Sequence, residues 1–129
     1  PDWEKVEHPP SSEDGPIIAL HVVKFNDRTE LGETPEKMAK YTSKAATVGT
    51  EHGVRVSGWF GVEGTIVGDG REWDQVRFNA FPSKAAFMAV IQDPARLEAQ
   101  KAHREPAIAD TYALIVRTKF DQIKDSIEQ

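Results

Sequence analysis

The stretch of residues 72–97, EWDQVRFNAFPSKAAFMAVIQDPARL, constrains the fold most, because its hydrophobic period changes once and the helical pattern is then interrupted once. Its first part alternates between a more apolar and a more polar face, which is typical of a strand. Pro82 removes a ladder donor and ends the strand, and Ser83 is a good helix N-cap. Asp93 and Pro94 form a new N-cap and first helical residue. The stretch therefore predicts a strand followed directly by two helices.

The rest of the chain adds three strands and one helix. Alternating apolar patterns predict strands at residues 16–25, 54–67, 72–81 and 110–117. Thr34 and Pro35 begin the other helix, and His52 and Gly53 are its C-terminal cap. The helical region after Ser83 is expected to end near residue 105, because Pro106 breaks the pattern. The element order is βαββαβ, with the second helical region divided in two.

This order predicts an α+β fold of the ferredoxin-like type, a four-stranded antiparallel sheet with helices on one face. The other face would carry aromatic residues, namely Trp59, Trp73, Phe81 and Tyr112. That is more aromatic surface than a soluble monomer usually exposes. We therefore expect a two-fold homodimer that buries this face.

A chain of 129 residues has room for one domain. Residues 1–15 are rich in proline, serine and charge, which predicts a disordered or extended arm. Residues 16–118 form the predicted domain. Residues 119–129 are expected to form a helical tail with one apolar side, made by Phe120, Ile123 and Ile127. This side would lie against a neighbouring surface.

Charge and composition exclude several partners. The net charge is −5 and no basic run occurs, which argues against nucleic acid and acidic membranes as partners. No apolar run reaches the roughly 18 residues of a membrane span. The chain has no cysteine, so disulfides and thiolate metal sites are excluded. We expect a cytoplasmic protein.

Residues 77–117, RFNAFPSKAAFMAVIQDPARLEAQKAHREPAIADTYALIVR, resemble the second half of the DUF1330 family. There, a strand ending in a Phe-Pro-Ser turn leads to a helix, an Asx-Pro or Ser-Pro break, a second short helix and a final strand. The family belongs to the dimeric α/β barrel superfamily, with antibiotic-biosynthesis monooxygenases, muconolactone isomerases and EthD proteins. The resemblance implies the fold and dimerisation. It implies no catalytic residues, because DUF1330 is a family of unknown function.

A candidate site follows if one sheet face carries His21 together with Trp59, Gln75, Arg77, Asn79 and Tyr112. Such a face could bind a planar, anionic or phenolic molecule. Arg77 would pair with a carboxylate or enolate, His21 could transfer a proton near neutral pH, and Asn79 could orient an oxygen. In the alternative interpretation, Arg77 pairs with an acid such as Glu63 and His21 is a hydrogen-bonded core histidine.

Other candidates are weaker. His103 and Arg104 are adjacent on the last helix, so a solvated charged surface is the favoured interpretation. The four histidines show no i, i+4 pair, so we expect no metal site, and nothing indicates a cofactor. Two functions stay open, a small-molecule-binding or scaffolding dimer and a cofactor-independent isomerase or monooxygenase acting on a phenolic or enolisable substrate. A cavity reaching His21 or Arg77 would favour the enzyme, and a filled interior would favour the non-catalytic dimer.

Overall fold

The computed structural model of the chain describes residues 15–28, 32–119 and 121–122. The elements along the chain are β1 (Ile17–Phe25), α2 (Glu36–Glu51), β2 (Arg55–Gly61), β3 (Gln75–Phe81), α3 (Lys84–Gln92), α4 (Pro94–Ala99), the π-helix η2 (Gln100–Arg104), α5 (Glu105–Ala107) and β4 (Ile108–Val116). Most of the predicted arm and the apolar tail residues Phe120, Ile123 and Ile127 lie outside the described residues. No helix in the described part of the chain is long and apolar enough to span a membrane.

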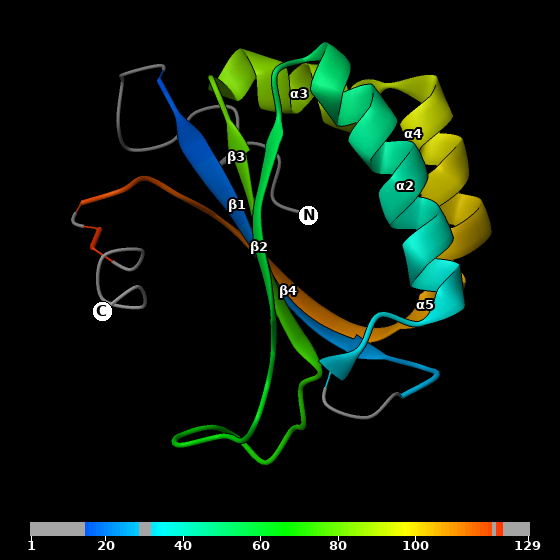
Figure 1. Ribbon diagram of the computed structural model, residues 1–129, viewed down its shortest axis with the longest axis vertical. Helices are drawn as coiled ribbons and strands as arrows, with labels where there is room; N and C mark the ends of the chain where they lie inside the picture. The colour runs from blue at the N-terminus through cyan, green and yellow to red at the C-terminus, as the bar shows by residue number, and fades with distance from the viewer. Residues whose placement is uncertain (1–14, 29–31, 120, 123–129) are drawn as a thin grey trace.

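The four strands form one antiparallel sheet in the order β2-β3-β1-β4. All the helices that the structure describes lie on one face of this sheet, and α2 runs alongside α4 (Figure 1). The strands β1 and β3 are central, and β2 and β4 are the edges. This arrangement confirms the predicted α+β, ferredoxin-like fold.

The predicted helix starts after residue 82 are confirmed by their caps. The Ser83 hydroxyl accepts a hydrogen bond from the Ala86 amide at 3.0 Å, and the Asp93 carboxylate accepts one from the Ala95 amide at 2.9 Å. The helical region continues past the predicted break, because α5, which contains Pro106, follows η2 without a gap. As a result β4 begins at Ile108 and not at residue 110.

The hairpin strands are shorter than predicted, although the backbone of Asp74, just before β3, still hydrogen-bonds with Val23 and Val62. The Asp74 carboxylate is buried and accepts hydrogen bonds from the Phe25 amide at 2.8 Å and from Arg28 at 2.9 Å. This residue is therefore held by β1 and the loop after it. The strand β2 ends at Gly61 and β3 starts at Gln75.

Alternate residues of β1 face the helices and form two core clusters. Ile17 and Ala19 pack with Phe81, Phe87 and Val90 in the first cluster. A second cluster, at the other end of the strand, consists of Val23, Phe25, Met38 and Ala107. His21 lies in the same row of β1 side chains, between the two clusters.

Two of the four predicted aromatic residues are not on the open face, so that part of the prediction is wrong. Phe81 is buried on the helix side, with its ring centre 5.0 Å from that of Phe87. Trp59 also faces the helices, because an irregularity near Ser57 reverses the alternation of β2. Before this irregularity Arg55 pairs with Ala80, and after it Trp59 pairs with Arg77.

The open face carries a different aromatic set. Tyr112 pairs with Val22, on the side opposite His21, and its ring centre lies 5.5 Å from that of Trp73. Phe60 pairs with Val76 on the same side and is 46% exposed. The described residues therefore leave an apolar sheet surface without a helical cover (Figure 1).

Candidate functional site

A cavity of about 1170 Å³ lies between the sheet and the helices, and it reaches both His21 and Arg77. It is larger than a typical ligand pocket of roughly 300–1000 Å³. Residues of both edge strands line it and remain partly exposed, with Trp59 of β2 44% and Ile115 of β4 36% exposed. The interior on the helix side of the sheet is therefore not filled.

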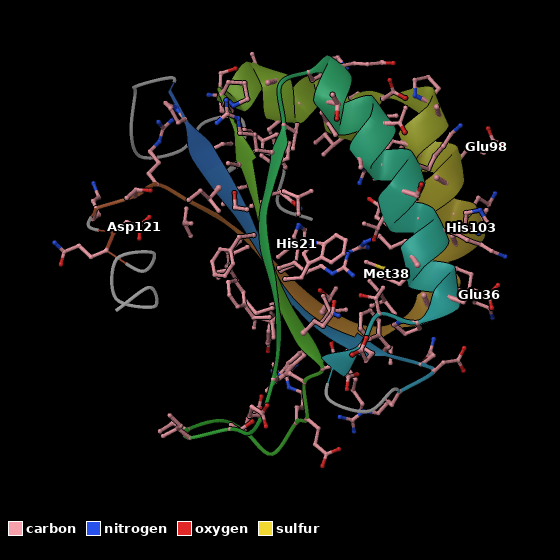
Figure 2. The ribbon with its side chains drawn as sticks, in the orientation of Figure 1. His21, Glu36, Met38, Glu98, His103 and Asp121 are labelled. Carbon is pink, nitrogen blue, oxygen red and sulfur yellow. The ribbon has the colours of Figure 1, made fainter. Side chains whose placement is uncertain are left out.

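One row of paired residues crosses the whole sheet beneath this cavity. Trp59 pairs with Arg77, Arg77 pairs with His21, and His21 pairs with Ala113. Directly paired residues of an antiparallel sheet point to the same face. The row therefore brings the predicted histidine, arginine and tryptophan together, and Figure 2 shows His21 on the side of the sheet that faces the helices.

Neutral oxygen atoms hold Arg77 in a fixed position. Its Nε donates to Gln75 Oε1 at 2.8 Å, its Nη1 to Thr42 Oγ1 at 2.8 Å and its Nη2 to Thr34 Oγ1 at 3.2 Å. The predicted ion pair with Glu63 is wrong, because all three partners are uncharged. Burial lowers the pKa of Arg77 to about 10, which leaves the guanidinium charged at neutral pH.

The Thr34 hydroxyl explains why α2 starts one residue later than predicted. It accepts from the Gln75 amide at 2.9 Å and from Arg77, so it is engaged with β3 and does not cap the helix. Pro35 is the N-cap residue and makes no side-chain cap. Gln75 is itself buried and supports Arg77 without lining the cavity.

His21 is a neutral base among cations. Burial, followed by the positive charges of Arg104, Arg77 and Arg96, lowers the pKa of His21 from 6.5 to about 4. Its Nδ1 atom is buried and has no hydrogen-bond partner among the described residues. The alternative of a hydrogen-bonded core histidine therefore leaves Nδ1 unexplained, since buried polar atoms are normally paired.

Two further arginines reach the cavity from the helices. Arg96 donates to the Ile91 carbonyl at 3.2 Å and to Gln100 Oε1 at 2.8 Å. Arg104 lies over the Tyr41 ring, 5.9 Å from its centre, and burial lowers the pKa of its guanidinium. The predicted solvated position of Arg104 is wrong.

A π-helix explains the position of Arg104. Residues 96, 100 and 104 follow an i, i+4, i+8 spacing, and all three line the cavity. The i→i+5 hydrogen bonds of η2 widen the last turn, a rare feature that often marks functional sites. The neighbouring His103 lies on the outer side of the helices in Figure 2, consistent with the two residues having different surroundings.

The cavity wall is cationic, although the protein is acidic overall. Of the described residues that line it, six carry positive charge, namely Arg77, Lys84, Arg96, Arg104, Arg117 and Lys119, and none is aspartate or glutamate. The whole chain has a net charge of −5. Like charges gathered in a partly buried site raise its energy unless an anion is present.

Four of the six predicted site residues come together in the cavity wall, and two, Gln75 and Tyr112, do not line it. His21, Trp59, Arg77 and Asn79 line the cavity. Tyr112 does not, because it lies on the open face and hydrogen-bonds with Arg71. Sequence reasoning missed the helical contributors Tyr41, Thr42, Arg96, Gln100 and Arg104. The spacing of residues 96, 100 and 104 was the signal that could have found three of them.

In the part of the chain that the structure describes, no group of three or more metal-ligating side chains occurs. The polar atoms of the cavity are instead donors and neutral acceptors. The remaining wall is apolar, with Ile17, Phe81, Phe87, Val90 and Ile91 at one end. The cavity can therefore hold a molecule that has both a negative group and an apolar part.

No family model and no curated protein sequence matches the chain, so the resemblance to DUF1330 stays a prediction. The chain is similar to the solved structure of RPA0582, a protein of unknown function from Rhodopseudomonas palustris. That similarity covers 92% of each chain, with 28% identity and a TM-score of 0.76.

More distant similarities concern the fold alone. A dabb family protein with a ferredoxin-like fold from Mesorhizobium loti is 10% identical, with a TM-score of 0.61 over 81% of this chain and 97% of that one. SnoaB, a cofactor-independent oxygenase from Streptomyces nogalater, is 11% identical, with a TM-score of 0.53 over 84% of this chain and 98% of that one. The chain therefore has a ferredoxin-like fold.

Proposed function

We propose that the protein binds a small anionic molecule with an apolar body in the cavity between its sheet and its helices. The observation that supports this proposal is the composition of the cavity wall, which among the described residues has six cations and no acid in a protein of net charge −5. A ligand carboxylate would offset the mutual repulsion of Arg77, Arg96 and Arg104. A neutral ligand would leave that repulsion in place.

The test compares an acid with its neutral amide. Calorimetric titration with 1-naphthoate and 1-naphthamide should give binding of the carboxylate that is tighter by at least about tenfold. Arg104→Gln should remove most of this preference, and Arg55→Gln, a change on the exposed surface of β2 outside the cavity, should leave it intact. Equal affinity for acid and amide, or no binding of either at millimolar concentration, would contradict the proposal.

A second candidate function is cofactor-independent catalysis, in which His21 removes a proton from a phenolic or enolisable substrate. Its support is the buried, unpartnered Nδ1 atom in the cavity, together with a cavity that reaches His21 and Arg77. The proton would move from the substrate O–H or C–H to Nδ1, and Arg77 would stabilise the resulting phenolate or enolate. SnoaB shows that one distant structural relative is a cofactor-independent oxygenase.

Deuterium exchange separates this second function from binding alone. An enolisable acid such as phenylpyruvate, incubated with the protein in D₂O, should exchange its α-protons faster than the buffer does, and His21→Gln should abolish the acceleration. Arg104→Gln should weaken substrate binding while the exchange at saturation persists. A wild-type protein that binds the acid and gives no exchange above the buffer is a binding protein for it.

We also propose that the protein is a homodimer joined through the open face of the sheet. Phe60 and Tyr112 are 46% and 48% exposed on that face, and Trp73 lies against Tyr112. Apolar surface of this kind is usually covered in soluble proteins. Light scattering of the purified protein tests the proposal, and a monomer at micromolar concentration would contradict it.

A further inference from the structure

We infer that the preferred ligand is a linear aliphatic monocarboxylic acid of about ten carbons, an inference that rests on the proposed function and specifies its ligand. The carboxylate would lie at Arg77 and Arg104, and the chain would run along β1 to the apolar end at Ile17. Three observations support this assignment, namely the free donors at the charged end, the apolar wall near Ile17 and the distance between the two.

The charged end has donors to spare. A guanidinium has five N–H donors. Arg77 uses three of them on Gln75, Thr42 and Thr34, so two N–H groups on its terminal nitrogens remain for a ligand. Arg104 reaches the same region, because its guanidinium lies over the Tyr41 ring and Arg77 donates to the adjacent Thr42. One carboxylate can therefore meet two guanidinium groups.

The end of the cavity near Ile17 is apolar. Ile17, Phe81, Phe87 and Val90 line it and are between 2% and 9% exposed. Side chains of this kind accept an alkyl chain and provide no donor or acceptor. Between the two ends, the floor consists of Ala19 of β1 and its paired residue Asn79 of β3, so one polar side chain lies beside an apolar one.

The length of the ligand follows from the strand. His21 is four positions after Ile17, and a strand rises by about 3.3 Å per residue, which gives about 13 Å. An extended chain advances by about 1.2 Å per single bond, judged from the roughly 3.6 Å that three backbone bonds span. About ten or eleven bonds therefore fit between the two ends, which corresponds to an acid of about ten carbons.

Three more cations line the cavity beyond Ile17, where α3 begins and β4 ends. These are Lys84, Arg117 and Lys119. Lys84 and Arg117 already interact with other groups of the protein, so a second carboxylate is not needed to balance them. A monocarboxylic acid is therefore preferred to a dicarboxylic acid of the same length.

The experiment is a calorimetric series with the sodium salts of linear acids from six to sixteen carbons, each below its micelle concentration. Affinity should rise by about fourfold per methylene up to about ten carbons and then stop rising. Sebacate, the ten-carbon dicarboxylate, should bind more weakly than decanoate. Tighter binding of sebacate, a flat series, or tighter binding of 1-naphthoate than of decanoate would overturn the inference and leave the proposed function standing.

Two variants test the position of the chain. Val90→Phe fills the apolar end and should move the best chain length to shorter acids, whereas Ala85→Phe, on the exposed side of the same helix, should not. Circular dichroism melting would show that both variants fold. An unchanged optimum in folded Val90→Phe would overturn the assignment of this end. Absence of binding by every acid, 1-naphthoate included, would overturn the proposed function as well.

Discussion

The guanidinium carbon of Arg77 lies 4.4 Å from the centre of the Trp59 ring, and the two residues are directly paired between β3 and β2. A cation over an aromatic face is stabilised by the ring quadrupole. Trp59 is nevertheless 44% exposed, because it belongs to an edge strand. The contact with Trp59 therefore holds the Arg77 guanidinium in the cavity at the β2 edge of the sheet.

Replacing Trp59 tests this contact. Trp59→Leu should lower the free energy of unfolding by about 1 kcal/mol through loss of the cation–π interaction, as for partly exposed pairs. Trp59→Phe is the matched control, since it keeps an aromatic face and should lose less. Urea unfolding followed by circular dichroism measures both values. Equal losses in the two variants would show that the ring face contributes nothing to Arg77.

The pKa of His21 predicts a loss of stability in acid. Its value is about 4 in the folded protein and 6.5 as the ordinary value, so the unfolded chain takes up the proton first as the pH falls. The contribution of His21 is fully present above pH 6.5 and is lost between pH 6.5 and 4. The whole shift corresponds to about 3 kcal/mol.

Urea unfolding at pH 7.5 and pH 4.5 measures this loss. The wild-type protein should lose about 2 to 3 kcal/mol more than His21→Leu between these two pH values, because the variant has no proton to take up at this position. His103→Leu is the control, since His103 lies on the outer side of the helices (Figure 2). If His21→Leu loses as much as the wild type, the imidazole does not titrate as the structure predicts.

Arg104 should lower the basicity of His21 at a distance. Among the charges acting on His21, that of Arg104 is the largest, after burial itself. Arg104→Gln should therefore raise the pKa of His21 above about 4, while burial keeps it below 6.5. NMR titration of the imidazole signals provides the measurement, with Arg55→Gln as the control. An unchanged value would mean that Arg104 points away from the cavity in solution.

The elements that the sequence predicts well are those with a local signal. Ser83 and Asp93 identify two helix starts, because a cap is a relation between residues two or three positions apart. The row Ala19, His21 and Val23 is equally local, since alternation within one strand determines the face. The structure shows in addition that His21 lies between the two core clusters.

The faces of the edge strands could not be predicted in this way. Tyr112 lies on the open face because His21 pairs with Ala113, and a register one residue different would have reversed it. Trp59 changed face through an irregularity near Ser57 that leaves no sequence pattern. Arg104 depends on a widened helical turn in addition to its spacing. Register, bulges and turn width are set by contacts between distant segments.

A charge on the open face should separate the proposed dimer without affecting the cavity. Phe60 is 46% exposed and points away from the helices. Its ring lies edge-on to the Phe78 ring, with 5.9 Å between the two ring centres. Phe60→Glu would place an unpaired carboxylate against the partner's apolar surface, which is costly when the surface is buried. The variant should therefore be a monomer by light scattering, and its melting temperature should depend less on protein concentration than that of the wild type.

The matched control is Glu98→Lys, which changes a charge on the outer side of the helices (Figure 2) and should leave the dimer intact. Because the cavity lies on the opposite face of the sheet from Phe60, monomeric Phe60→Glu should still bind the same anion. Loss of both association and binding would show that the dimer completes the cavity. A Phe60→Glu protein that remains dimeric would place the interface on another surface, because a buried carboxylate at this position could not be tolerated.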